Sequence, residues 1–189
     1  WAIVKKTLIF SDVHLKVAEA GRSHQQEFIA FFKQFRAEEY DRIICLGDLF
    51  DVWFEYRHVV FSGYFDVLRA FAEFRDAGIE LHLVCGNHDF WAGRFLQDEI
   101  GFRLHRAPVK LPFGEKDTLL AHGDGLNKSD YGYRIFKKVA RNPVVIGAFR
   151  LLHPDWAMMI ARGMSRGSRT ISQKKDTAHG SEARALRAY

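Results

Sequence analysis

Cysteine and long apolar runs are both scarce in this sequence. Its 189 residues include two cysteines, Cys45 and Cys85, too few for the disulfide framework of a small secreted domain. Both lie in apolar segments, so we expect them to be buried core residues with free thiols. No stretch approaches the ~20 uninterrupted apolar residues of a membrane-spanning helix. Residues 1–6 lack the pattern of a signal peptide.

A large excess of one charge is also missing. The chain carries 28 Lys and Arg against 23 Asp and Glu, a net charge of +5 with neutral histidines. This excess favours phosphate esters, nucleic acid or an acidic membrane face as partners, without choosing among them. Apolar residues make up 48% of the chain, which excludes intrinsic disorder for most of it, and the length suits one domain. Because the first residue is not Met, we expect a longer parent protein.

The first half of the chain alternates short apolar runs with helical patterns. Three apolar runs predict strands: 7–10, 42–46 and 81–85. Phe residues at helical spacing predict helices over 24–37 and 64–77, the second ending at Gly78. Strand–helix–strand order predicts an α/β fold with a mostly parallel sheet and helices on its faces.

The second half no longer alternates strands and helices. Short strands are predicted over 102–111 and 117–121, around a Pro-Phe-Gly turn. A helical region follows over 131–164, interrupted by Pro143 and Pro154. Its apolar residues come after a sheet that already has its own core, so we expect these helices to cover a ligand. Ordinary packing against the domain is the alternative.

Polar clusters directly follow four of the predicted strands. They are Asp12-x-His14, Gly47-Asp48, Gly86-Asn87-His88-Asp89 and His122-Gly123-Asp124. Ligands of open α/β sheets bind outside the carboxyl ends of the strands, so we expect these clusters to converge. Carboxylate, amide oxygen and imidazole suit divalent Mn, Fe or Zn, and Asp48 can bridge two ions. A pair of ions ~3.5–4 Å apart can clamp a phosphoryl group and activate water.

This series of motifs resembles that of the calcineurin-type metallophosphoesterases, over residues 7 to about 125. The resemblance implies a metallophosphoesterase-type β-sandwich flanked by helices. It also implies two divalent metal ions, for which we expect Mn²⁺, with Fe or Zn as alternatives. The family's final Gly-His-x-His motif is missing from the sequence, so the chain either stops short of it or has lost it.

The resemblance also implies a role for each matching residue. Asp12 and His14 would bind one ion, Asp48 would bridge both, and the second ion would be bound by the last two ligands, Asn87 and His122. His88 would be catalytic, as a proton donor or charge stabiliser near the leaving group.

One branch of that family, the UDP-2,3-diacylglucosamine diphosphatases of lipid A synthesis, is similar in further details. Residues 47–53 and 122–126, followed by Asp130 and Tyr133, resemble motifs of that branch. In the branch, a helical insertion after these motifs forms a lid over acyl chains. Members differ at the position of His88, where some carry Arg and others His. The resemblance implies hydrolysis of the substrate's pyrophosphate to UMP and 2,3-diacylglucosamine 1-phosphate.

We therefore expect a core over 1–130, a helical lid over 131–175 and a polar tail over 176–189. The expected substrate-binding residues are Asn87, Asp130, Tyr133, Ser168, Arg169 and Lys174. The expected partners are a lipid-linked nucleotide diphosphate and an anionic membrane surface, without nucleic acid. These partners imply a cytoplasmic protein, peripheral on the inner face of the cell membrane. Two other functions stay open: a phosphoesterase for a soluble nucleotide or other ester, and a non-catalytic scaffold with the same fold.

Overall fold

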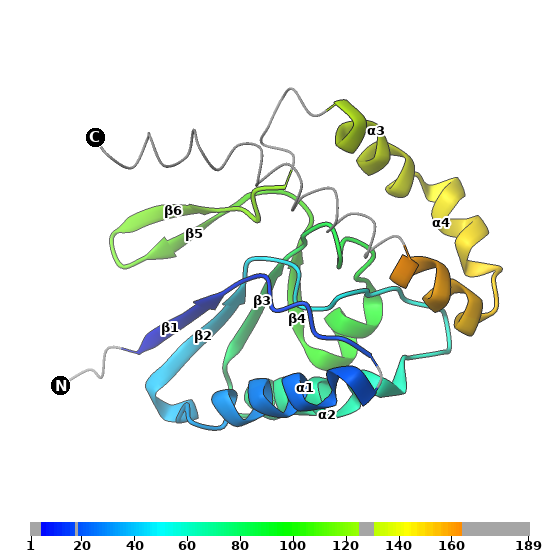
Figure 1. Cartoon of the computed structure of the whole chain (residues 1–189). Coiled ribbons are helices and arrows are strands. Elements are labelled where there is room, and N and C mark those ends of the chain that lie inside the picture. Colours follow the sequence, from blue (N-terminus) through cyan, green and yellow to red (C-terminus); the bar gives the residue numbers. More distant parts are fainter. Residues whose placement is uncertain (1–4, 18, 125–130, 164–189) are drawn as a thin grey trace, which may run out of the picture. The chain divides into compact units, whose positions relative to one another are not determined.

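A parallel sheet of four strands lies at the centre of the computed structural model (Figure 1). In spatial order the strands are β1 (Lys6–Phe10), β2 (Tyr40–Cys45), β3 (Glu80–Val84) and β4 (Phe102–His105). The structure describes residues 5–17, 19–124 and 131–163. The predicted parallel α/β sheet is confirmed, because all three neighbouring strand pairs run parallel.

Two helices, α1 (Glu19–Phe32) and α2 (Phe65–Asp76), pack beside the sheet (Figure 1). Phe32 and Phe71 are each 1% exposed, and their rings lie 5.3 Å apart in the core. The helix predicted over 64–77 is confirmed as α2. The bounds predicted for the first helix, 24–37, are wrong, because α1 begins five residues earlier and ends at Phe32. After Phe32, the backbone N–H groups of Gln34 and Phe35 donate to carbonyls three residues earlier, whereas an α-helix uses carbonyls four residues earlier.

Three shorter helical turns join these elements. They are η1 (Ala37–Glu39), η2 (Ser62–Tyr64) and the π-helical η3 (Phe95–Ile100). Cys45 and Cys85 are buried with free thiols, as predicted.

A hairpin of β5 (Val109–Phe113) and β6 (Lys116–Leu120) forms a second, antiparallel sheet. Its apolar side chains pack with Ile44 and Val84 of the parallel sheet, which makes a second, smaller core. The single strand predicted over 102–111 is wrong, since β4 ends at His105 and β5 begins at Val109. Pro108 lies in the break, where proline cannot donate a hydrogen bond to a strand ladder.

Helices α3 (Tyr131–Ala140) and α4 (Pro143–Arg150) follow, and Asn142 caps α4 by accepting the Val144 N–H at 2.8 Å. The predicted interruptions are confirmed, because helices restart at Pro143 and Pro154. The chain divides into two compact units, residues 1–151 and 152–189, and the described part of the second is helical over 154–163. Among the described residues, no helix is long and apolar enough to cross a membrane.

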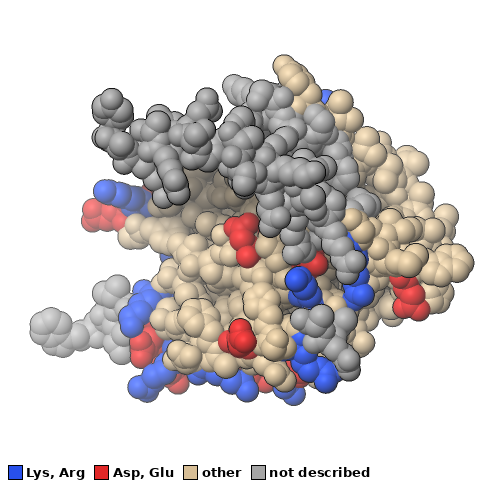
Figure 2. Space-filling view, viewed as in Figure 1, with Lys and Arg blue, Asp and Glu red and all other residues tan. Residues whose placement is uncertain are grey.

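Charged side chains of both signs share the face seen in Figure 2. Blue Lys and Arg atoms alternate with red Asp and Glu atoms along its lower rim. Elsewhere, on α2, Arg69 pairs with Asp66 at 3.2 Å and with Glu73 at 3.8 Å. The described residues of this face therefore carry mixed charge.

Candidate metal centre

The loops that follow β1 and β2 continue the pairing of these strands beyond the sheet. The Asp12 N–H donates to the Gly47 carbonyl, the His14 N–H to that of Asp48, and the Leu15 N–H to that of Leu49. These bonds are 2.9–3.0 Å long. They place the first two polar clusters side by side, as the positions after neighbouring strands predicted.

Three residues of these loops adopt left-handed backbone conformations. The φ angles of Asp12, His14 and Asp48 are 55°, 50° and 54°. Residues other than glycine seldom adopt such angles, and they cluster at functional sites where the surrounding structure enforces them. Here the backbone bonds between the two loops hold all three residues in place.

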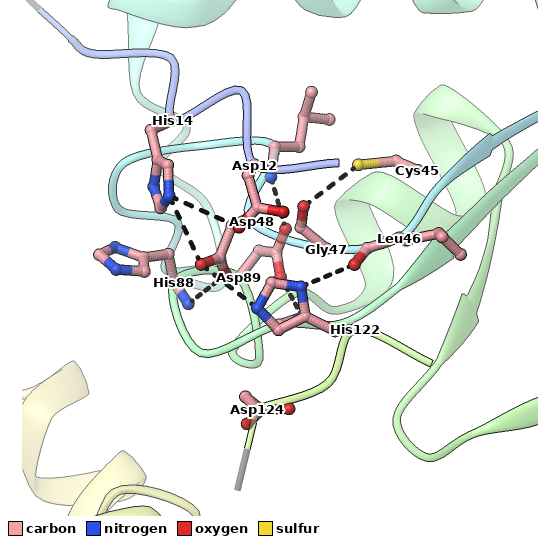
Figure 3. Close-up of polar contacts among 12 residues, drawn as sticks. Asp12, His14, Cys45, Leu46, Gly47, Asp48, His88, Asp89, His122 and Asp124 are labelled. Carbon is pink, nitrogen blue, oxygen red and sulfur yellow. Dashed lines mark hydrogen bonds and ion pairs between the residues drawn. The ribbon is translucent and has the colours of Figure 1, made fainter. Parts of the chain in front are cut away.

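Asp48 lies at the middle of the cluster (Figure 3). Its side chain is almost fully buried, and Oδ2 lies 3.4 Å from His122 Nε2 and 3.7 Å from His14 Nε2. Oδ1 accepts the backbone N–H of His88 at 3.0 Å. Burial favours protonation of this carboxyl, but the hydrogen bond and charge of His122 lower its pKa below the usual value.

Two groups of side chains around Asp48 can each hold a metal ion. One contains His14, Asp48 and His88, and the other Asp12, Asp48 and His122, with ligand atoms within 4.8 Å of one another in each group. The predicted convergence of four strand ends is thus present, with Asp48 shared. In this grouping Asp12 lies with His122, whereas the family resemblance paired Asp12 with His14. Carboxylate and imidazole donors in two adjoining groups fit a pair of divalent ions.

His122 is oriented as metal-binding histidines are. Its Nδ1 lies 2.7 Å from the Leu46 carbonyl, which can only accept, so Nδ1 carries the proton and Nε2 faces Asp48. Burial opposes a positive charge on this ring, but the bond and charge of Asp48 outweigh it and raise the pKa of His122 to about 9. The two side chains therefore form an ion pair at neutral pH.

His88 is held by the loop after β2. Its Nδ1 lies 2.6 Å from the Asp51 carbonyl, so this nitrogen also donates and Nε2 is the one available to a ligand. The rings of His88 and His14 meet edge to face at 4.7 Å. Asn87 lies half-buried on the same loop, directly before His88.

Asp89 ties together the loops that follow β2 and β3. Its fully buried carboxyl accepts the Leu49 N–H at 3.0 Å and the Gly86 N–H at 2.6 Å. Burial, with the nearby charge of Asp48, raises the pKa of Asp89 to about 7. Glycine is required at 86 because a Cβ there would collide with the Asp48 carboxylate. The close approach of these loops depends on both residues.

The structure brings together Asp12, His14, Asp48, His88 and His122. Four expected substrate-binding residues lie outside the described part of the chain: Asp130, Ser168, Arg169 and Lys174. Tyr133 lies in α3, but its side chain is not described. The residues that the sequence did not single out are Asp51, which holds His88, and the buried Glu55. An acidic residue within an apolar stretch is the signal that could have identified Glu55.

Helices α3 and α4 contact the loops of the centre through several side chains. Lys137 Nζ pairs with Asp124 Oδ2 at 2.6 Å, two residues after His122. The Trp91 indole N–H donates to the Ala140 carbonyl at 2.8 Å. The Trp91 ring also lies 4.8 Å from that of Phe149 in α4. Both helices are therefore built onto the loops that carry the cluster.

Known proteins share this sequence pattern. The family described as Calcineurin-like phosphoesterase matches residues 5–167. A protein named UDP-2,3-diacylglucosamine hydrolase from Porphyromonas gingivalis is 34% identical over 183 residues, covering 91% of this chain and 66% of that protein. One of the same name from Azotobacter vinelandii is 31% identical over 171 residues, covering 90% and 69%. This chain spans about two thirds of the length of both relatives.

Among solved structures, the crystal structure of Pseudomonas putida nuclease MPE superposes with a TM-score of 0.39. It is 22% identical, and the superposition covers 58% of this chain and 52% of that chain.

Proposed function

Since this chain belongs to the calcineurin-like phosphoesterase family, we propose that it hydrolyses the pyrophosphate bond of UDP-2,3-diacylglucosamine. The products are UMP and 2,3-diacylglucosamine 1-phosphate, in lipid A synthesis. The observation that carries the proposal is the pair of potential metal-binding groups that share Asp48. The substrate comes from the name that these relatives carry, and they are similar over about nine tenths of this chain.

The residues of the centre hold and orient the reacting groups. Asp12, His14, Asp48, Asn87 and His122 would hold two divalent ions, for which Mn²⁺ is the first candidate. When bound, such ions neutralise charge on the phosphoryl oxygens and lower the pKa of water. The backbone bonds after β1 and β2 fix the ligands before the substrate arrives, so little reorganisation is needed during the reaction.

His88 acts on the leaving group in this proposal. A water oxygen attacks the α-phosphorus, the bond from that phosphorus to the bridging oxygen breaks, and the lipid 1-phosphate leaves. With Nδ1 donating to the Asp51 carbonyl, His88 can offer Nε2 to the departing oxygen. When Nε2 is also protonated, the ring stabilises the developing negative charge or donates the Nε2 proton to the departing oxygen.

The helices after the core support a substrate that carries acyl chains. Ile135, Val139 and Val144 on α3 and α4 expose large apolar side chains, as a lid for acyl chains requires. Residues 131–175 form this lid in our proposal, between a core over 1–130 and the tail 176–189. Polar contacts to the substrate are assigned to Asn87 and Asp130 of the core and to Tyr133, Ser168, Arg169 and Lys174 of the lid.

The same exposed side chains support peripheral binding to the cytoplasmic face of an anionic membrane. Co-sedimentation with anionic vesicles tests this surface. The Val144→Ser variant should bind less than wild type, while Val60→Ser, an exposed valine outside these helices, should bind as wild type. Equal binding by both variants at every salt concentration would remove the membrane from the proposal.

The substrate is tested with the full-length protein and its metals. We expect release of UMP from UDP-2,3-diacylglucosamine at a kcat/KM well above that for a soluble sugar nucleotide or a nitrophenyl diester. Equal rates on all three substrates would favour a phosphoesterase for soluble esters. Bound metal below one ion per chain, with no turnover, would instead identify a scaffold.

A further inference from the structure

Arg141, at the end of α3, is a half-buried cation that lacks an anionic partner among the described residues. Its Nε is buried and has no hydrogen-bond partner in that part of the chain. Its guanidinium lies over the Phe90 ring at 5.6 Å. A buried guanidinium nitrogen without an acceptor is costly, so this side chain is suited to accept an anion from outside the described chain.

The position of Arg141 follows from its neighbour one helical turn earlier. Lys137 and Arg141 are four residues apart, and the Arg141 N–H still donates to the Lys137 carbonyl at 3.1 Å. Side chains at this spacing share one face of a helix. Lys137 uses that face to pair with Asp124, near His122, while Arg141 reaches Phe90, near His88. Among the described residues, one cation on this face is therefore neutralised and the other is not.

The loop that carries Phe90 is also held by Arg106. Arg106 donates to the Phe90 carbonyl at 3.0 Å and to the Ala92 carbonyl at 2.6 Å. Trp91 between them donates to Ala140, the residue before Arg141. The guanidinium thus stands on a rigid aromatic platform, two residues from His88. Planar guanidinium groups bind phosphate oxygens through two parallel N–H donors.

We propose that Arg141 binds a phosphate group of the ligand beside residues 88–91. The phosphate can come from the diphosphate of the substrate or from a membrane headgroup. The inference rests on the proposed function only in naming these two sources. Arg141 then neutralises ligand charge at a point separate from the metal ligands. The guanidinium retains its contact with the Phe90 ring while its free donors take the phosphate oxygens.

The test measures binding, so it does not depend on turnover. Inorganic pyrophosphate is titrated into the protein by calorimetry, with Mn²⁺ and with a chelator, and phosphatidylglycerol vesicles form a second arm. Arg141→Gln should weaken binding roughly 10-fold or more, the usual effect of losing a charged hydrogen bond. Loss in the pyrophosphate arm assigns the site to the substrate's diphosphate, and loss in the vesicle arm alone assigns it to a headgroup.

Arg22→Gln is the matched control, since Arg22 is an exposed arginine of α1, outside the helices that the proposal assigns to the lid and the membrane. It should bind both probes as wild type does. Arg141→Lys keeps the charge without the planar fork, so its binding should lie between that of wild type and Arg141→Gln.

Wild-type affinity in Arg141→Gln, or equal weakening in Arg22→Gln, would overturn the inference. Hydrolysis of UDP-2,3-diacylglucosamine by wild type is measured separately. Its absence alongside a normal Arg141 effect would refute the proposed substrate and leave the anion site standing.

Discussion

Asp48 uses its two carboxylate oxygens differently. Oδ1 is engaged by the His88 backbone N–H, while Oδ2 faces the Nε2 atoms of His14 and His122. A cation that approached Oδ1 would compete with a backbone hydrogen bond that holds the loop after β3. Oδ2 is therefore the Asp48 oxygen that would be available to metal ions.

Replacing Asp48 by Asn should remove that shared ligand while keeping the side-chain shape. We expect turnover to fall by roughly 10³-fold, because bound metal ions contribute several kcal/mol of charge stabilisation. Elemental analysis should show loss of metal from both groups. Asp66→Asn, an exposed carboxylate of α2, is the control and should behave as wild type. Two ions per chain and normal turnover in Asp48→Asn would contradict a shared ligand.

His88→Ala tests a catalytic role apart from metal binding. Turnover should fall by roughly 10²–10⁴-fold, the usual contribution of a general acid or base. Metal content should stay unchanged, because the proposed ligand set does not include this ring. The exposed His24 of α1 provides the control, as His24→Ala. If His88→Ala loses metal, His88 instead belongs to the ligand group with His14 and Asp48.

The clusters of the candidate centre could be predicted from the sequence because each directly follows an apolar strand. The contacts that orient them could not. The backbone carbonyl of Asp51 holds His88, and the carboxylate of Asp89 holds Leu49, across 37 and 40 positions of sequence. No local pattern indicates these partners, since the choice depends on how two loops pack against each other.

At the scale of elements, Glu55 joins two segments that are distant in the sequence. Its buried carboxylate accepts the Trp53 indole N–H at 3.1 Å and three backbone N–H groups, from Gly93, Phe95 and Leu96, at 2.7–3.3 Å. The last two donors belong to the first turn of η3. A carboxylate is favoured there because the first turn of a helix leaves backbone N–H groups without partners.

Glu55→Gln should therefore lower the free energy of unfolding by about 1–3 kcal/mol, since an amide NH₂ cannot accept the bonds that one carboxylate oxygen accepts. Urea unfolding at neutral pH measures the change. Glu73→Gln, an exposed residue of α2, should change it by less than about 0.5 kcal/mol. An unfolding curve for Glu55→Gln that matches the control would mean that the buried bonds add little stability.

Strands and helices were predicted best where one face is uniformly apolar. Strands β2 and β3 and helix α2 satisfy that condition and were found within about two residues. The start of α1 was missed because its first residues, 19–23, are polar or small and show no apolar spacing. Predicting one strand over 102–111 failed because β4 pairs with β3 and β5 with β6, a division that depends on tertiary pairing.

At the scale of the whole molecule, stability should depend on a histidine pair in the parallel sheet, outside the candidate metal ligands. His82 Nδ1 and His105 Nε2 share a hydrogen bond of 2.9 Å between β3 and β4. Burial lowers the pKa of both rings, with a further contribution from Arg103, while Glu80 opposes the shift at His82. Both histidines are therefore neutral in the folded protein at neutral pH.

Acid should destabilise the fold through this pair. Below the ordinary histidine pKa of about 6.5, both histidines take up protons in the unfolded chain but stay neutral in the folded protein. The free energy of unfolding therefore falls as pH falls. We expect His82→Leu to flatten the dependence of the melting temperature on pH between about 6.5 and 5. His24→Gln, at an exposed position, should leave the slope unchanged. Parallel slopes for wild type and His82→Leu would exclude the pair as its source.

The bonds between the loops after β1 and β2 also bear on how the centre opens. Because the Asp12, His14 and Leu15 amides extend the strand ladder, these loops belong to the same cooperative unit as the sheet. In deuterated water their amides should exchange as slowly as those of β2, and far more slowly than those of ordinary surface loops. Removing metal would then leave a folded template in place, and reloading would require no refolding of these loops.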